Sequence, residues 1–187
     1  MGACIRISLL GPFAIEQIDI TRLNRKTRAI LAYLAATGTA HTRQALYDMF
    51  CQEANDPAGL LRWHLSQLRQ HLGPESFQIT RQEVAIAPAQ VETDLRPFVT
   101  GMGNPTTQTT AQLHHTANLY RGNFLEGLTL HNAPEFELWL LGERSRFQLL
   151  YEKGAAVLVD RCIQRQAYPQ AIALSQRLLQ KNCNGQA

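Results

Sequence analysis

The spacing of apolar residues changes twice between residues 5 and 86, and this succession constrains the fold more than any other feature of the chain. Apolar and polar residues alternate over 5–15, on either side of a Gly-Pro break, which is typical of two short strands joined by a turn. Apolar residues then recur at helical spacing. The three helices that this spacing predicts cover 24–37, 43–53 and 56–72. Alternation returns over 77–80 and 84–86 and predicts a hairpin.

Strands, three helices and a hairpin, in this order, are the elements of a winged helix-turn-helix. In that fold two helices support a third, which enters the major groove of DNA, and the hairpin forms a wing. Beyond residue 97 the strand pattern disappears. The helical patterns that follow cover 110–120, 135–165 and 169–180. Helices with apolar stripes must bury them on each other, as in a bundle or a tetratricopeptide-like stack.

These patterns predict an α+β chain that is mostly α and has two domains. Residues 1–97 are expected to form a winged-helix DNA-binding domain with a small N-terminal sheet and a C-terminal wing hairpin. Residues 98–187 are expected to form an all-α, tetratricopeptide-like domain whose last helical repeat is truncated.

Composition narrows the chemistry without identifying a partner. The 187 residues include 18 Lys and Arg and 15 Asp and Glu, and the net charge of +3 by itself indicates neither a nucleic acid nor a membrane. Neither a membrane-spanning apolar segment nor a secretory signal pattern occurs, so we expect a cytoplasmic protein without a membrane partner. Four dispersed cysteines, unsuitable histidine spacing and missing catalytic motifs predict no metal site, no cofactor and no catalytic residue. We therefore expect no enzymatic activity.

Motifs along most of the chain resemble those of one family. The relevant segments of the first part are 5–13, 25–34 and 61–69, and those of the second part are 119–127, 133–140 and 168–174. On these segments the chain resembles the antibiotic regulatory protein (SARP) family of transcriptional regulators, which join an OmpR-type winged helix to a bacterial transcriptional activator domain. The resemblance implies an activator that binds repeated half-sites on double-stranded DNA, contacts RNA polymerase and forms a homodimer on DNA. The family's wing turn usually contains Gly-Tyr or Gly-Gly-Tyr, whereas residues 82–84 are Gln-Glu-Val here.

The third predicted helix carries the candidates for reading bases. Its leucines at 61, 65, 68 and 72 form an apolar stripe, so the opposite face is available to a partner. The residues expected to face bases on that side are Trp63, Ser66, Gln67 and Gln70, beside Gly59. Those expected to face phosphates are Arg62 and Arg69 on the flanks of this helix, Thr42 and Arg43 at the start of the second helix, and Arg81 at the wing tip.

Charge is segregated in a way that favours a polyanion. Residues 21–47 contain five basic side chains and no carboxylate, and residues 57–74 contain two arginines, two histidines and no carboxylate. Each phosphate contact would release condensed counterions. The alternative for the helix face, and for Arg81, is that they are merely solvated.

Two other functions remain open at this point. Ten basic and nine acidic residues through position 97 nearly cancel, which favours a helical protein-interaction or signalling adaptor module. The truncated last repeat favours the N-terminal part of a larger ATP-binding regulator, although these 187 residues contain no phosphate-binding loop motif.

Overall fold

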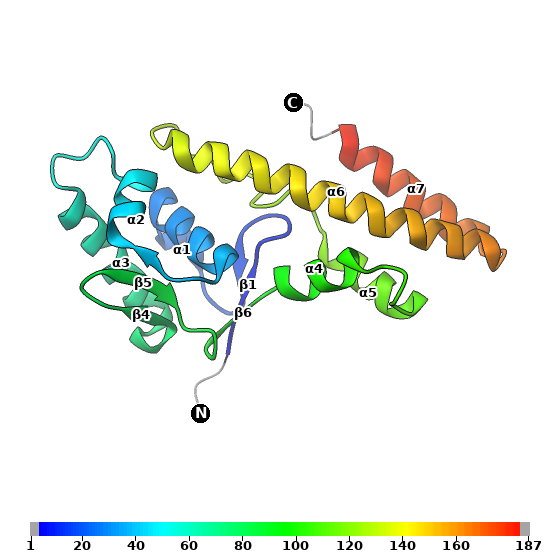
Figure 1. The fold of residues 1–187 in the computed structure, drawn as a ribbon, viewed down its shortest axis with the longest axis horizontal. Helices are drawn as coiled ribbons and strands as arrows, with labels where there is room; N and C mark the ends of the chain where they lie inside the picture. Colours follow the sequence, from blue (N-terminus) through cyan, green and yellow to red (C-terminus); the bar gives the residue numbers. More distant parts are fainter. Residues whose placement is uncertain (1–3, 184–187) are drawn as a thin grey trace. The chain divides into compact units, whose positions relative to one another are not determined.

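The computed structural model describes residues 4–183 and divides into two compact units, each assembled from separate stretches of the chain (Figure 1). Within the described residues, unit 1 comprises 4–9, 13–93 and 127–141, and unit 2 comprises 10–12, 94–126 and 142–183. Each unit thus contains a segment that comes from far away in the sequence. The position at which the sequence suggested a domain boundary, residue 97, lies inside a helix of unit 2.

Unit 1 contains the three helices that the sequence predicts. They are α1 (Arg25–Thr37), α2 (Arg43–Phe50) and α3 (Pro57–Leu72). Each begins at a side-chain cap: Asn24, Thr42 and Asp56 accept a hydrogen bond from a backbone N–H in the first turn. α1 ends at Gly38, whose φ of 63° is left-handed. α2 ends three residues earlier than predicted.

Two three-stranded sheets complete unit 1 within the described chain. In the first, β1 (Ile5–Ser8) pairs antiparallel with β2 (Ala14–Ile15) and parallel with β6 (Val91–Thr93). In the second, β5 (Glu83–Ile86) lies between β3 (His41–Thr42) and β4 (Phe77–Ile79), and all pairings are antiparallel. The hairpin β4–β5 is the predicted wing, and β3 attaches it to the start of α2. Short 3-10 turns lie at Ile20–Arg22 and Pro74–Ser76.

The core of unit 1 includes side chains of a helix that the sequence assigns to the second domain. The first turns of α6 (Pro134–Gln164) belong to unit 1. There the ring of Phe136 lies 5.3 Å from that of Phe50 and 5.5 Å from that of Trp139, and Trp139 lies 4.8 Å from Tyr33. Phe136 is fully buried. The sequence predicted that helices with apolar stripes pack on each other, and the first turns of α6 pack on α1 and α2 of unit 1.

Unit 2 is helical. It contains α4 (Leu95–Gly103), α5 (Thr110–Leu119), the remainder of α6 and α7 (Tyr168–Cys183). Its core is a cluster of stacked and edge-on rings, formed by Phe98, Tyr120, Phe124, Phe147 and Tyr151. Gly154 of α6 faces Met102 so closely that an added Cβ would meet its Sδ atom. This glycine, which weakens a helix in isolation, permits the approach of α4.

A turn from the N-terminal strands belongs to unit 2. The N–H of Leu10 donates to Asp94 Oδ2 at 3.1 Å, and Arg121 Nη2 lies 3.2 Å from the same oxygen. The N–H of Arg121 donates to Leu10 O, and the N–H of Glu126 donates to Gly11 O, both at 3.0 Å. Two of the motifs on which the family resemblance rests, 5–13 and 119–127, therefore meet in the fold.

Candidate nucleic-acid interface

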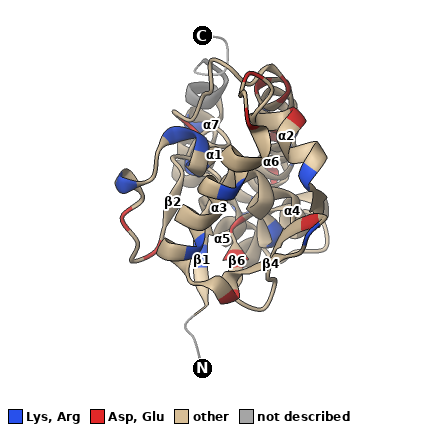
Figure 2. Ribbon diagram, turned by 90° about the vertical axis from the view of Figure 1, so that its left-hand side faces the viewer, with Lys and Arg blue, Asp and Glu red and all other residues tan. Residues whose placement is uncertain are grey.

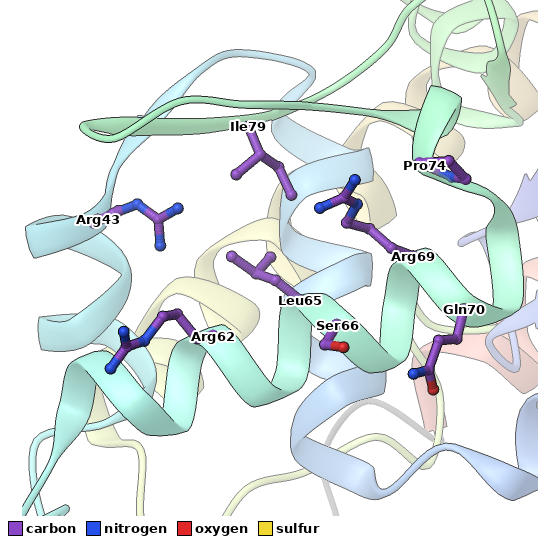
Figure 3. Close-up of a pocket in the computed structure, with 8 residues that line it drawn as sticks. All are labelled: Arg43, Arg62, Leu65, Ser66, Arg69, Gln70, Pro74 and Ile79. Carbon is purple, nitrogen blue, oxygen red and sulfur yellow. The ribbon is translucent and has the colours of Figure 1, made fainter.

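A groove of about 370 Å³ lies in unit 1 between α3, the start of α2 and the wing strand β4 (Figure 3). Its lining residues are Arg43, Arg62, Leu65, Ser66, Arg69, Gln70, Pro74 and Ile79. Five of the nine residues that the sequence proposed for DNA binding are thus gathered in one place. The remaining four, Thr42, Trp63, Gln67 and Arg81, do not line the groove.

The placement of these side chains follows from the leucine stripe of α3. Leu61, Leu65, Leu68 and Leu72 are buried, as the spacing predicted. Arg62, Ser66 and Arg69 follow one another at i, i+4 and i+7, so they share the side of α3 that borders the groove. Trp63 lies beside them on the outer face, with 49% of its surface exposed. The helix therefore presents an arginine-lined edge next to an aromatic and amide face.

The groove is electropositive. Three of its eight lining residues are arginines and none is a carboxylate. Among the ion pairs between described residues, none involves Arg43, Arg62 or Arg69. Figure 2 shows Lys and Arg positions on both α1 and α3. Guanidinium groups gathered without acidic partners suit an anion such as phosphate, which Arg binds with its planar fork.

Apolar side chains form the rest of the groove. Figure 3 shows Leu65 of α3 and Ile79 of β4 directed toward each other between the arginines. Leu65 is 4% exposed and Ile79 is partly exposed. Leu65, Pro74 and Ile79 were not among the residues proposed from the sequence, because apolar residues at core spacing carry no signal of a groove.

The start of α2 uses its polar groups within the protein. Thr42 caps the helix, since its Oγ1 accepts from the N–H of Ala45 at 3.1 Å. The side chain of Arg43 crosses to the wing, where Nε and Nη2 donate to the backbone oxygen of Thr80 at 3.2 and 3.0 Å. Whether either residue also contacts phosphate stays a prediction.

The wing turn is closed by a threonine. Thr80 Oγ1 accepts from the N–H of Gln82 at 3.2 Å and from that of Glu83 at 2.9 Å, and the N–H of Thr80 donates to Glu83 O at 2.9 Å. No residue from 80 to 83 adopts a positive φ, so the turn does not need the glycines usual in the SARP family. Arg81 is exposed at the tip. Sequence reasoning missed Thr80, although a hydroxyl residue just before a short turn is a signal for this arrangement.

A buried histidine supports α3 from behind. His64 is 2% exposed, and its Nδ1 lies 2.7 Å from Oγ1 of the buried Thr27 in α1. Burial, with a smaller contribution from the nearby charge of Lys26, lowers the pKa of His64 to about 4. The imidazole is therefore neutral near pH 7. Its ring packs edge-on against Trp63 at 5.0 Å, so the contact between α1 and α3 also positions the exposed indole.

Unit 2 has a groove of its own, of about 680 Å³. It is lined by residues of α4, α5 and the segment between them, including Arg96, Gln108 and His115. No group of three or more His, Cys, Asp or Glu side chains in the described part of the chain is arranged to hold a metal ion. None of the helices formed by residues 4–183 is both long and apolar enough to span a bilayer.

Comparison with known proteins supports the fold. No protein-family model matches the sequence. No curated protein matches it either. Among solved structures, the chain is similar to Mycobacterium tuberculosis EmbR in complex with a low-affinity phosphopeptide, with a TM-score of 0.60 and 18% sequence identity. The similarity covers 92% of this chain and 55% of the EmbR chain, so this chain spans little more than half the length of that relative. The similarity shows that most of this chain shares its fold with part of EmbR.

Proposed function

We propose that the chain is a sequence-specific DNA-binding transcriptional regulator that presents α3 to the major groove. The observation that carries the proposal is the groove beside α3, with three arginines and no carboxylate. A strand of the DNA backbone would follow this groove, with Arg62 and Arg69 at its phosphates. Ser66, Gln67 and Gln70 would meet base edges, and Trp63 would meet a thymine methyl or a sugar. Arg81 would extend the contact from the wing.

The proposal extends to partners by resemblance alone. The SARP motifs support a homodimer on repeated half-sites, contact with RNA polymerase and activation of transcription. The similarity to EmbR supports the fold in which these motifs occur. The proposed activity needs no cofactor, metal ion or catalytic residue, since binding is its whole chemistry.

The salt dependence of DNA binding tests the proposal. Affinity of the full chain for a short random-sequence duplex is measured by fluorescence anisotropy over a series of KCl concentrations. Arg62→Ala and Arg69→Ala should each reduce the slope of log affinity against log salt by roughly 0.9, because each removes about one phosphate contact.

The matched control is Arg6→Ala. Arg6 is an exposed arginine of β1 in the same unit, and it lies 3.8 Å from Glu16 and 3.6 Å from Glu92. Arg6→Ala changes the net charge by the same amount as Arg62→Ala or Arg69→Ala. It should nevertheless leave the slope of log affinity against log salt close to that of the unaltered protein. Equal slopes for all three variants, or no binding to duplex, would refute the DNA-binding proposal. Selection of sites from random duplexes then measures specificity and half-site spacing.

A protein-interaction module is the second candidate. The nearly equal numbers of basic and acidic residues through position 97 favour it. Such a module would show no salt-dependent binding to duplex. The same titration therefore separates the two functions.

A further inference from the structure

Besides the pairing of β3 with β5, the side chain of Arg43 in α2 holds the wing. Nε and Nη2 of Arg43 both donate to Thr80 O, and the backbone N–H of Arg43 donates to Gln82 O at 2.8 Å. Thr80 and Gln82 are the two neighbours of Arg81 in the sequence. Arg43 thus holds the carbonyl groups on both sides of the residue at the wing tip.

These contacts engage two of the five N–H donors of the Arg43 guanidinium within the protein. Nε and one Nη form one of the two-donor forks with which a guanidinium grips a phosphate. In Arg43 this fork is directed at Thr80 O. The other arginines of the groove differ, since no hydrogen bond from the side chain of Arg62 or Arg69 is among those of the described residues.

We propose that Arg43 is a positioning residue of the DNA interface, which fixes the wing so that Arg81 reaches the DNA backbone, and is not itself a phosphate contact. The inference rests on the proposed DNA-binding function. It also accounts for the departure from the family's wing sequence. The turn contains no glycine, and two sets of hydrogen bonds stabilise the conformation of 80–83. The hydroxyl of Thr80 accepts from backbone N–H groups within the turn, and the side chain of Arg43 in α2 donates to Thr80 O.

A double-mutant cycle distinguishes positioning from direct contact. The full chain and the variants Arg43→Ala, Arg81→Ala and the double variant are titrated with the same random-sequence duplex at several salt concentrations. Arg81→Ala should lower the salt slope by roughly 0.9. Arg43→Ala should lower the salt slope by at most that amount. The double variant should have the same salt slope as Arg81→Ala alone. A phosphate contact made by Arg43 would instead lower the slope of the double variant by roughly another 0.9.

The free protein provides a second readout that does not depend on DNA. Trypsin cleaves after Arg81 only when the wing tip opens, so Arg43→Ala should raise the rate of cleavage there several-fold. The matched control is Gln44→Ala, which alters the next residue of α2, where Gln44 Nε2 donates to Asp48 Oδ1 at 2.8 Å. This control should be cleaved at the rate of the unaltered protein. The far-ultraviolet circular dichroism of all variants is recorded to confirm that they are folded.

Three results would overturn the inference. They are additive effects of the two substitutions on the salt slope, unchanged cleavage after Arg81 in Arg43→Ala, and wild-type DNA binding by Arg81→Ala. None of them would refute DNA binding itself, which Arg62→Ala and Arg69→Ala test independently. Conversely, if those two variants keep the wild-type slope, the proposed function fails first.

Discussion

Replacing Phe136 with alanine should destabilise the winged-helix unit, although the residue lies about forty positions beyond its last strand. The side chain is 0% exposed and packs against the rings of Phe50 and Trp139. Truncating a fully buried phenylalanine costs about 3–5 kcal/mol, from lost burial and from the cavity left behind. A domain has a total stability of only about 5–15 kcal/mol. The expected loss is therefore a large part of the stability of unit 1.

Urea denaturation followed by tryptophan fluorescence measures this effect. The chain has two tryptophans, Trp63 and Trp139, and both lie in unit 1, so their emission reports on that unit. The matched control is Leu138→Ala, two residues away on the same helix, where the side chain is 71% exposed. That variant should lie within about 0.5 kcal/mol of the unaltered protein. If Phe136→Ala and Leu138→Ala have the same midpoint, the first turns of α6 do not stabilise unit 1 and the reasoning is wrong.

Two further predictions concern buried groups. The pKa of His64 is lowered to about 4 in the folded protein. Between about pH 6.5 and pH 4, His64 is therefore protonated in the unfolded chain but neutral in the folded chain. The free energy of unfolding should fall as the pH drops through this range, by up to about 3 kcal/mol. Urea denaturation of His64→Gln should show a smaller loss over the same range, and an equal loss would contradict the assignment. In α6, Gly154→Ala should be less stable than Gly142→Ala by about 1–3 kcal/mol, because the new methyl group meets buried Met102 at position 154 and nothing within 4 Å at position 142. Thermal unfolding compares these two variants, and a more stable Gly154→Ala would show that Met102 moves aside freely.

The elements that sequence patterns predicted well are those with long stripes and strong ends. α1 and α3 have caps at Asn24 and Asp56, and the leucine stripe of α3 specifies its buried side without knowledge of any partner. α4 was missed because its nine residues include two glycines and a proline, which hide the helical pattern. β3 and β6 have two and three residues, too few for an alternation to be recognised.

Contacts between segments distant in the sequence could not be predicted, for a different reason. A stripe on a helix shows that the face is buried but not what covers it, so nothing in the sequence indicated that Phe136 would pack on Phe50. The groove itself was not predicted, although five of its lining residues had been proposed for DNA binding from the sequence. The hydrogen bonds from the Arg43 side chain to Thr80 O were not predicted either. They join residues 37 positions apart, and their acceptor is a backbone oxygen that any residue could supply.

The return of residues 127–141 to unit 1 also determines when that unit can be finished during synthesis. A ribosome adds roughly 5–20 residues per second, so the chain beyond Thr93 grows for several seconds before Phe136 emerges. Until then, Phe50 lacks the ring of Phe136 and Tyr33 lacks the ring of Trp139. Much of unit 2 is synthesised in this interval. We therefore expect chaperones to bind the unfinished winged helix while the helices that follow it are being made.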